Sequence, residues 1–236
     1  MLRIFRHIEC EGPGFLAELL AEKQIDFDLV EIDKGQSVPN SLDGISGLVF
    51  LGGPMSVNDN SAWIEDELAL IRKAHKVDMP MLGFCLGSQL ISKALGGVVS
   101  RGDMGQEIGW HNIYPVDGEV SEHWLGSWKE PLLAFHWHGE TFSLPPKAQL
   151  ILSSQAYSHQ AFVIGKTLAL QCHVEVSADM VKEWASLYTD DLNQGGQWNQ
   201  TANEINSNLE NKVVTLRKTA RPLLEKWLDG LSREQE

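Results

Sequence analysis

The chain has 236 residues, of which 43% are hydrophobic and 22% are charged. This length is enough for one large domain or two small ones, and the composition is that of a globular protein. Lysine and arginine number 19 against 32 aspartate and glutamate residues, which gives a net charge of −13 at neutral pH. Binding to nucleic acid or to an anionic membrane needs a basic surface, so the charge argues against both partners.

The three cysteines, Cys10, Cys85 and Cys172, are an odd set without the spacing of metal ligands. The first residues (MLRIFRH) turn charged and polar at once, unlike a secretory signal peptide. No apolar run approaches the ~20 residues that a membrane span needs. We therefore expect a cytoplasmic protein whose thiols are free.

The first part of the chain alternates short apolar runs with helical patterns, which is typical of a parallel α/β sheet. Strands are predicted at 2–6, 27–32, 45–51 and 79–84, and helices at 13–23, 63–75 and 86–95. Each predicted helix therefore lies between two predicted strands, as a crossover connection requires.

After Gly96-Gly97 the pattern changes to several β-rich segments in succession. We predict an antiparallel extension and closing strands of the same sheet at 108–116, 132–137, 150–153, 160–164 and 167–172. From Ser177 the pattern is helical to the end, interrupted at 193–197. The predicted architecture is an α/β three-layer sandwich around a mostly parallel twisted sheet with an antiparallel extension.

The strongest local pattern is Gly83-Phe84-Cys85-Leu86-Gly87, between an apolar strand and an amphipathic helix. It has the form of a nucleophile elbow with cysteine as the nucleophile. Such a sharp turn strains its central residue and leaves no room for side chains two positions away, which explains the glycines. Free N–H groups at the helix start favour the nucleophilic thiolate. The alternative is an ordinary buried cysteine in a tight turn.

A second pattern is Cys172-His173-Val174-Glu175, at the end of a predicted strand. Residues two apart on a strand face the same side, so His173 and Glu175 are expected to point together and Val174 away. A carboxylate beside an imidazole can fix its tautomer and stabilise the imidazolium, as in a catalytic triad. The alternative is an ordinary polar pair at a strand end.

A third pattern is the loop Gly52-Gly53-Pro54-Met55-Ser56, which follows a predicted parallel strand. Ligands of such folds bind at the carboxyl edge of the sheet, where this loop presents backbone N–H groups. The N–H of Gly53 and that of Leu86 are predicted to form an oxyanion hole. Taken alone, the loop is explained equally well as a plain turn.

The segments GGPMS, GFCLGSQL and CHVE, in this order and spacing, resemble the class I glutamine amidotransferases, and best the stand-alone members similar to the glutaminase domain of GMP synthase. The resemblance runs from about Leu2 to Glu175. It implies the flavodoxin-like fold of that family, with Cys85 as nucleophile, His173 as general base and Glu175 as the residue that orients it.

The resemblance also implies a substrate site. Gln89 occupies the last position of the family's G-x-C-x-G-x-Q pattern and would contact the glutamine moiety. His138-Gly139-Glu140 resembles the family's S-H-G-D segment, with Trp137 and Glu140 in place of serine and aspartate. The longer side chain of Glu140 would shift the preference toward other γ-glutamyl compounds. Val174 replaces the family's usual proline, at a position expected to face away.

His136, His138 and Glu140 also alternate along one predicted strand, and an H-x-H-x-E pattern can bind a metal. Because the same residues fall on a family segment that needs no metal, we expect neither a metal nor another cofactor.

These observations predict hydrolysis of the glutamine γ-amide through a γ-glutamyl thioester, with ammonia released or passed to a separate synthase subunit. The first alternative is a free-standing γ-glutamyl peptide or amide hydrolase, and the second is a non-catalytic binding member of the fold. The predicted triad must converge in one site, so we expect a single domain over 1–236. It would consist of a motif-bearing core at 1–176 and a helical tail at 177–236.

Overall fold

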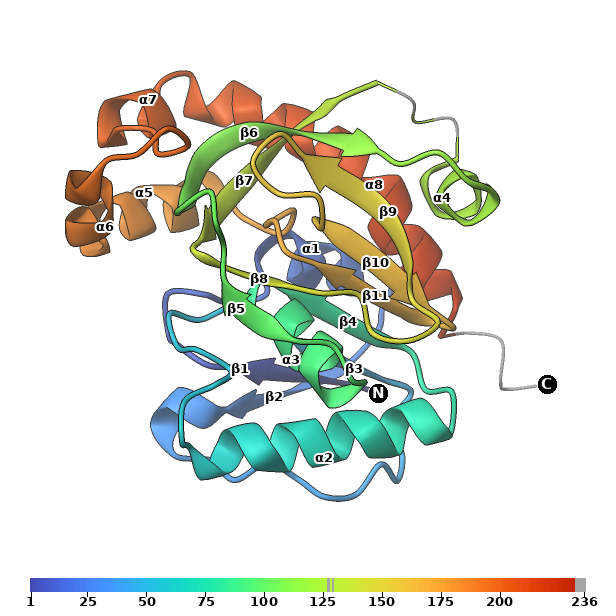
Figure 1. Ribbon diagram of the computed structural model, residues 1–236. Coiled ribbons are helices and arrows are strands. Elements are labelled where there is room, and N and C mark those ends of the chain that lie inside the picture. Colours follow the sequence, from blue (N-terminus) through green and yellow to red (C-terminus); the bar gives the residue numbers. More distant parts are fainter. Residues whose placement is uncertain (127, 129, 232–236) are drawn as a thin grey trace.

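The computed structural model describes residues 1–126, 128 and 130–231. Its centre is a nine-stranded sheet in the order β2-β1-β3-β4-β11-β10-β9-β6-β7 (Figure 1). The neighbours in the first half are parallel: β2 (Phe27–Glu31), β1 (Leu2–Arg6), β3 (Gly47–Phe50), β4 (Met81–Phe84) and β11 (Thr167–Leu170). The neighbours from β11 onward are antiparallel: β10 (Ala161–Ile164), β9 (Gln149–Ser154), β6 (Glu107–Pro115) and β7 (Leu132–His138). The predicted parallel sheet with an antiparallel extension is confirmed.

Side chains alternate between two apolar layers on the faces of this sheet. Ile4 and Val49 belong to one core, and Phe5 and Phe50 to the other, where their rings stack 4.9 Å apart. The first core is covered by three helices: α1 (Gly14–Glu22), α5 (Ala178–Leu187) and α8 (Leu209–Asp229). The second is covered by α2 (Ala62–Lys76) and α3 (Leu86–Ala94). In Figure 1, α3 lies in front of the sheet and α1 behind it, so the predicted three-layer sandwich is confirmed.

The long C-terminal helix α8 is fixed to both α1 and the sheet. Arg217 and Arg221 of α8 form ion pairs with Glu18 and Glu22 of α1. The buried indole of Trp227 donates a hydrogen bond to the Met81 oxygen at the start of β4 (3.0 Å). Two short helices, α6 (Thr189–Gln194) and α7 (Ala202–Asn206), lie between α5 and α8 in the sequence.

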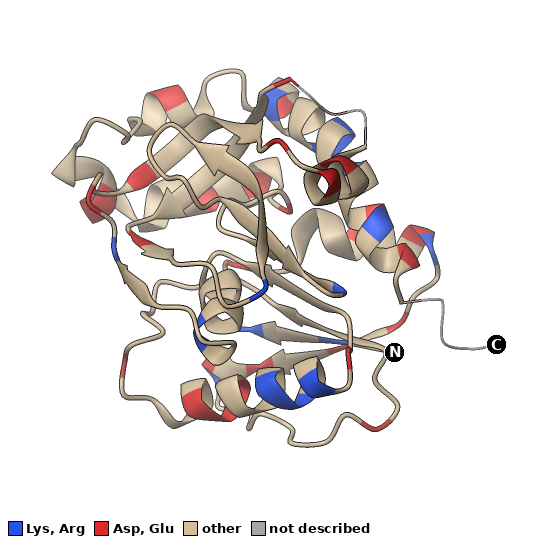
Figure 2. Ribbon diagram, turned by 45° about the vertical axis from the view of Figure 1, so that its right-hand side comes forward, with Lys and Arg blue, Asp and Glu red and all other residues tan. Residues whose placement is uncertain are grey.

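Charges on α2 follow the direction of the helix dipole. Along α2, Glu65 lies in the first turn, and Lys73 and Lys76 lie in the last (Figure 2). Acidic groups near a helix N-terminus and basic groups near its C-terminus stabilise the helix. Among the residues that the structure describes, no helix combines the length and the apolarity needed to cross a bilayer.

Several elements differ from the sequence prediction. The strands β5 (Val99–Arg101) and β8 (Glu140–Phe142) form a separate two-stranded antiparallel sheet that was not predicted. Helix α4 (Glu119–Leu125) was also missed. All three are too short to show a periodic pattern of apolar residues. In addition, the strand predicted at 167–172 ends earlier, at Leu170, and the residues after Leu170 decide the geometry of the site.

Candidate active site

Cys85 lies at the junction between β4 and α3, where the sequence predicts a nucleophile elbow. Its backbone has φ 47° and ψ −108°, with a positive φ that a non-glycine residue rarely adopts. A Cβ atom at Gly87 would lie 2.0 Å from the Phe50 oxygen of β3, and one at Gly83 would lie 2.6 Å from the Gly87 backbone. Both positions need glycine because the first turn of α3 packs directly on the strands. This packing holds the thiol at the carboxyl edge of the sheet, with 6% of Cys85 exposed.

His173 and Glu175 follow β11, which pairs with β4. The prediction that they share one face of a regular strand is wrong, because β11 ends at Leu170. Beyond Leu170 the chain no longer pairs with β10. The His173 N–H instead donates a hydrogen bond to the Phe135 oxygen of β7 (2.8 Å). The sheet is therefore curved enough for its last strand to reach the segment after β11. The side chains still meet, with His173 Nδ1 2.7 Å from Glu175 Oε1.

The His173 imidazole also interacts electrostatically with the Cys85 sulfur. Burial lowers the pKa of His173, but the Glu175 carboxylate and the Cys85 sulfur outweigh it and raise this pKa well above 6.5. The ring packs edge-on against Trp184, with centroids 4.8 Å apart. Gln171 donates from Nε2 to Cys85 Sγ (3.6 Å). The three predicted catalytic side chains are thus brought together, in surroundings that favour the charged form of the His173 imidazole.

The glycine loop after β3 lies beside the elbow. A Cβ atom at Gly53 would lie 3.0 Å from Leu86 Cδ2, so the two residues predicted to form the oxyanion hole are neighbours. Leu86 is the first residue of α3, and an N–H in the first turn has no partner within its own helix. His7 Nδ1 lies 3.1 Å from the Leu51 oxygen and 3.2 Å from the Gly52 oxygen. This buried imidazole therefore holds the start of the loop in place.

The predicted substrate residues gather around the backbone oxygen of Glu140. It accepts hydrogen bonds from Gln89 Nε2 (3.2 Å) and His138 Nδ1 (3.0 Å). The Glu140 carboxylate accepts from Ser56 Oγ, at 3.0 and 2.9 Å to its two oxygens. Gln89 and His138 are buried, whereas Glu140 is half-buried. Glu140 therefore presents the more accessible side chain, and the other two hold its backbone in place.

Glu11 is a further acidic residue near His173, and it belongs to none of the sequence patterns described above. It is buried in the loop between β1 and α1, and its Oε2 would lie 2.1 Å from a Cβ atom at Gly52. The same Cβ atom would lie 3.0 Å from His173 Cε1, so the carboxylate and the imidazole both lie beside Gly52. Burial raises the pKa of Glu11 to about 7, although His173 opposes this shift. An acid beside Gly and Pro residues after the first strand was the only sequence signal for it.

A second histidine–carboxylate group lies on β6 and β7. The predicted H-x-H-x-E alternation along one strand is wrong, because β7 ends at His138 and Glu140 is the first residue of β8. The Glu140 carboxylate accepts a hydrogen bond from Ser56 instead. The carboxylate that meets His136 and His138 is that of Glu107, from β6. Burial alone would raise the pKa of Glu107, but the two imidazoles hold it well below its usual range. Glu107 could not be found from local spacing, because it lies 31 residues from His138.

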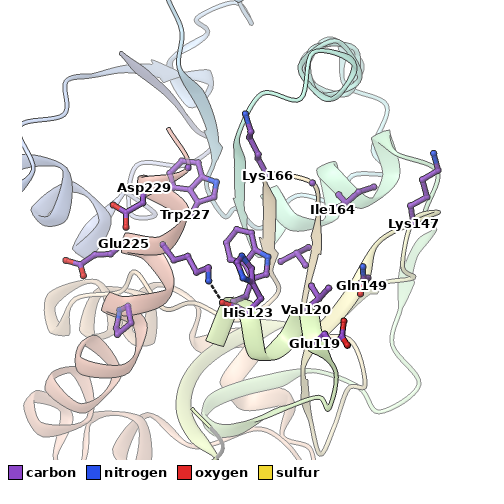
Figure 3. Close-up of a pocket in the computed structure, with 16 residues that line it drawn as sticks. Glu119, Val120, His123, Lys147, Gln149, Ile164, Lys166, Glu225, Trp227 and Asp229 are labelled. Carbon is purple, nitrogen blue, oxygen red and sulfur yellow. Dashed lines mark hydrogen bonds between the residues drawn. The ribbon is translucent and has the colours of Figure 1, made fainter. Parts of the chain in front are cut away.

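The cavity drawn in Figure 3 lies elsewhere. Its volume is about 960 Å³, and it is lined by α4, the β10–β11 turn and the C-terminal half of α8. Its walls include His123, Lys166 and Trp227. The β10–β11 turn lies at the start of β4, whereas Cys85 follows its end. This cavity is therefore separate from the predicted catalytic residues.

Comparisons with known proteins agree with the arrangement of this site. The family model described as "Glutamine amidotransferase class-I" matches residues 14–183. A glutamine amidotransferase of known structure from Methylobacillus flagellatus is 37% identical and superposes with a TM-score of 0.94, covering 100% of this chain and 96% of its own.

Two curated relatives represent different activities. Gamma-glutamyl peptidase 3 of Arabidopsis thaliana is 28% identical over 169 residues, which cover 69% of this chain and 68% of that protein. The glutamine-hydrolysing GMP synthase of Limosilactobacillus reuteri is 34% identical over 107 residues, which cover 45% of this chain and 17% of that protein. The resemblance drawn from the three sequence motifs is confirmed by these matches. The chain belongs to the class I glutamine amidotransferase family.

Proposed function

We propose that this protein hydrolyses the γ-amide bond of glutamine, or of a related γ-glutamyl compound, through Cys85, His173 and Glu175. The observation that carries the proposal is the position of His173. Its ring lies between the Glu175 carboxylate, 2.7 Å away, and the thiol of a cysteine held in an elbow with positive φ. A nucleophile, a base and a group that orients the base are the parts that covalent amide hydrolysis requires.

In the first half of the reaction, the Cys85 thiolate attacks the γ-carbonyl carbon. The negative charge that develops on the carbonyl oxygen is stabilised by the backbone N–H groups of Gly53 and Leu86. His173 then donates its proton to the leaving nitrogen, the C–N bond breaks, and a γ-glutamyl thioester remains on Cys85.

In the second half, neutral His173 takes a proton from water, and the hydroxyl attacks the thioester. The C–S bond breaks, glutamate leaves, and the thiolate–imidazolium pair is restored. Glu175 accepts a hydrogen bond from the Nδ1–H of His173 in both halves of the reaction. This bond keeps Nε2 of His173 directed at the reacting atoms and stabilises the imidazolium. The whole cycle balances with water as its only co-reactant.

The ammonia is either released or passed to an acceptor. The sequence has no G-x-x-x-x-G-K-[ST] phosphate-binding loop, so we propose that an ATP-using acceptor site, where there is one, belongs to a synthase partner outside residues 1–236. A catalytic thiolate works in a reducing compartment, and we propose the cytoplasm as the location.

A second candidate is a γ-glutamyl peptide or amide hydrolase that needs no partner. Two observations favour it: the match to gamma-glutamyl peptidase 3 covers more of this chain than the match to the GMP synthase, and Glu140 replaces the usual aspartate of the family segment. The same triad would serve both activities, because the two substrates share the γ-glutamyl carbonyl. A non-catalytic binding role is the third candidate.

One experiment separates these candidates. The purified chain is incubated with glutamine or with γ-glutamyl peptides, and ammonia, glutamate and free amines are measured. In parallel, labelling by a diazoketone analogue of glutamine is mapped by mass spectrometry. We expect turnover and labelling at Cys85, and a fall of at least about 10³-fold in Cys85→Ala because the nucleophile is removed.

Cys10→Ala is the matched control, since it removes another buried thiol. Turnover of γ-glutamyl peptides without turnover of glutamine would favour the second candidate. If neither substrate reacts and the analogue leaves Cys85 unlabelled, the chain is a non-catalytic member of the fold.

A further inference from the structure

We propose that Glu107, His136 and His138 form a binding site for one divalent transition-metal ion, with Zn²⁺ as the best match. One ligand atom from each of the three side chains lies within 4.8 Å of the other two. Glu107 and His136 are fully buried, and His138 is 6% exposed. Such a site departs from the sequence-based expectation that the protein holds no metal.

The pairing of β6 with β7 creates the cluster. Glu107 lies opposite His138 in the antiparallel register, and His136, two residues before His138, lies on the same face of β7. Glu107 Oε2 is 3.0 Å from His138 Nε2 and 3.3 Å from His136 Nδ1. In a tetrahedral site with metal–ligand bonds of ~2.0–2.1 Å, neighbouring ligand atoms lie about 3.3 Å apart. The two distances from Glu107 are therefore close to the spacing that such a metal requires, and the ligand atoms of His136 and His138 lie within 4.8 Å of each other.

The two hydrogen-bond partners of the His138 ring indicate a bound cation. Its Nδ1 lies 3.0 Å from the Glu140 backbone oxygen, and its Nε2 lies 3.0 Å from the Glu107 carboxylate. Both neighbours are acceptors, and a neutral imidazole has only one N–H to offer. With the proton on Nδ1, the lone pair of Nε2 faces the carboxylate, and a metal ion between them turns this repulsion into two bonds.

The surroundings of His136 independently indicate a bound cation. Neither of its ring nitrogens has a hydrogen-bond partner in the part of the chain that the structure describes, although the side chain is completely buried. Its contact with Glu107 Oε2 has the distance of an ion pair but not the geometry of a hydrogen bond. Glu107 Oε1 is likewise without a partner among these residues. Buried polar atoms are costly to leave unpaired, and a bound ion satisfies them.

Gln160 supplies a fourth ligand. Its Nε2 lies 2.7 Å from Glu107 Oε2, while its buried Oε1 has no partner among the described residues. Exchanging the two ends of the amide group would turn the oxygen toward the cluster. Two imidazoles, a carboxylate and an amide oxygen form a nitrogen and oxygen donor set without sulfur, which suits Zn²⁺.

The metal would act as a structural element behind the predicted substrate residues. On Nε2 of His138 it would fix the Nδ1 proton, and this N–H holds the Glu140 backbone oxygen. The same oxygen accepts from Gln89. A cavity of about 240 Å³, lined by Glu107, His111 and Trp198 among others, adjoins the cluster.

The test measures metal binding itself. The full chain, purified without a histidine tag, is stripped with a chelator and titrated with Co²⁺ and Zn²⁺. Co²⁺ in a tetrahedral site has strong visible absorption bands, and elemental analysis gives the stoichiometry. We expect one ion per chain, tetrahedral Co²⁺ bands that Zn²⁺ abolishes, and a higher thermal unfolding midpoint with Zn²⁺.

Variants assign the ion to this cluster. We expect His136→Gln and Glu107→Gln to weaken binding by at least 10-fold, while His75→Gln, on an exposed position of α2, binds as the wild type does. Repeating the titration with Cys85→Ala excludes the thiol as a ligand. Less than 0.1 equivalent of metal in the wild type, without any change in the unfolding midpoint, would overturn the proposal in favour of a metal-free Glu107–His138 ion pair. Equal binding by the wild type and His136→Gln would overturn it as well, and the wild-type titration decides even if a variant does not fold.

Discussion

Two of the buried histidine–carboxylate groups in this protein are built in different ways. His173 and Glu175 are two residues apart, and their side chains meet 2.7 Å apart just beyond the end of β11. Glu107 and His138 are 31 residues apart, and they meet only because β6 pairs with β7 in one particular register. The first group depends mainly on local chain geometry, and the second depends on a contact between strands.

The imidazoles also differ in their partners. His173 has an acceptor on one side and the Cys85 thiol on the other, so its ring can move a proton between fixed groups. The two ring nitrogens of His136 have no hydrogen-bond partner among the described residues. A buried histidine beside a carboxylate therefore indicates a particular function only when the partners of both ring nitrogens are known.

The largest expected effect distinguishes the Glu175 carboxylate from the Glu107 carboxylate. We expect Glu175→Gln to lower kcat/KM by roughly 10³-fold, because the amide keeps the shape but no longer stabilises the His173 imidazolium. The measurement is steady-state hydrolysis of the preferred γ-glutamyl substrate. Glu183→Gln, an exposed change on α5, is the matched control. A Glu175→Gln variant as active as this control would show that the pair has no catalytic role, and metal content should stay at the wild-type level in both variants.

An intermediate effect comes from Glu11, a second carboxylate near His173 that has no counterpart in the other group. Its folded-state pKa of about 7 lies above its ordinary value of 4.5, so burial favours the protonated acid. The stability that this protonated acid contributes is present below about pH 4.5 and is lost as the pH rises through 7. We expect the wild type to lose roughly 3 kcal/mol more than Glu11→Gln over this window, from 1.36 kcal/mol per pKa unit.

The measurement for Glu11 is the free energy of unfolding in urea at a series of pH values from 4.5 to 8. Glu9→Gln, an exposed neighbour, is the control and should follow the wild type. If the free energies of unfolding of the wild type and Glu11→Gln change with pH in parallel, Glu11 is ionised over the whole range. His173 would then have no protonated acid beside it, and this difference between the two groups would not exist.

The smallest effect concerns Glu140, which contacts His138 of the second group. Glu140 is held through its backbone by His138 and through its carboxylate by Ser56. Ser56→Ala removes the second contact, together with the hydrogen bond that Ser56 Oγ accepts from the Asn58 N–H. A hydrogen bond at a partly exposed position contributes about 1 kcal/mol. We expect KM for the γ-glutamyl substrate to change about 5-fold with kcat nearly constant. Ser207→Ala, at an exposed position, serves as the control, and a fall in kcat alone would contradict a role in binding.

Much of the parallel half of the sheet could be predicted because its signals are local. The strands around β3 and β4 are short apolar runs bounded by glycine, and Cys85 lies between glycines whose spacing an elbow requires. The pair His173 and Glu175 was also found by spacing, although the regular strand assumed for it does not exist. These residues are held instead by the hydrogen bond from the His173 N–H to Phe135 of β7.

The family, the alternation of strands and helices, and the identity of the predicted triad could all be inferred from sequence, because each depends on residues a few positions apart. The folded chain was needed to show which carboxylate meets His136 and His138, how Glu11 lies beside His173, and where Glu140 points. These features depend on the register of β6 against β7 and on the curvature that returns β7 to the segment after β11. Strand pairing is set by contacts far apart in the sequence, so no local pattern of residues could reveal it.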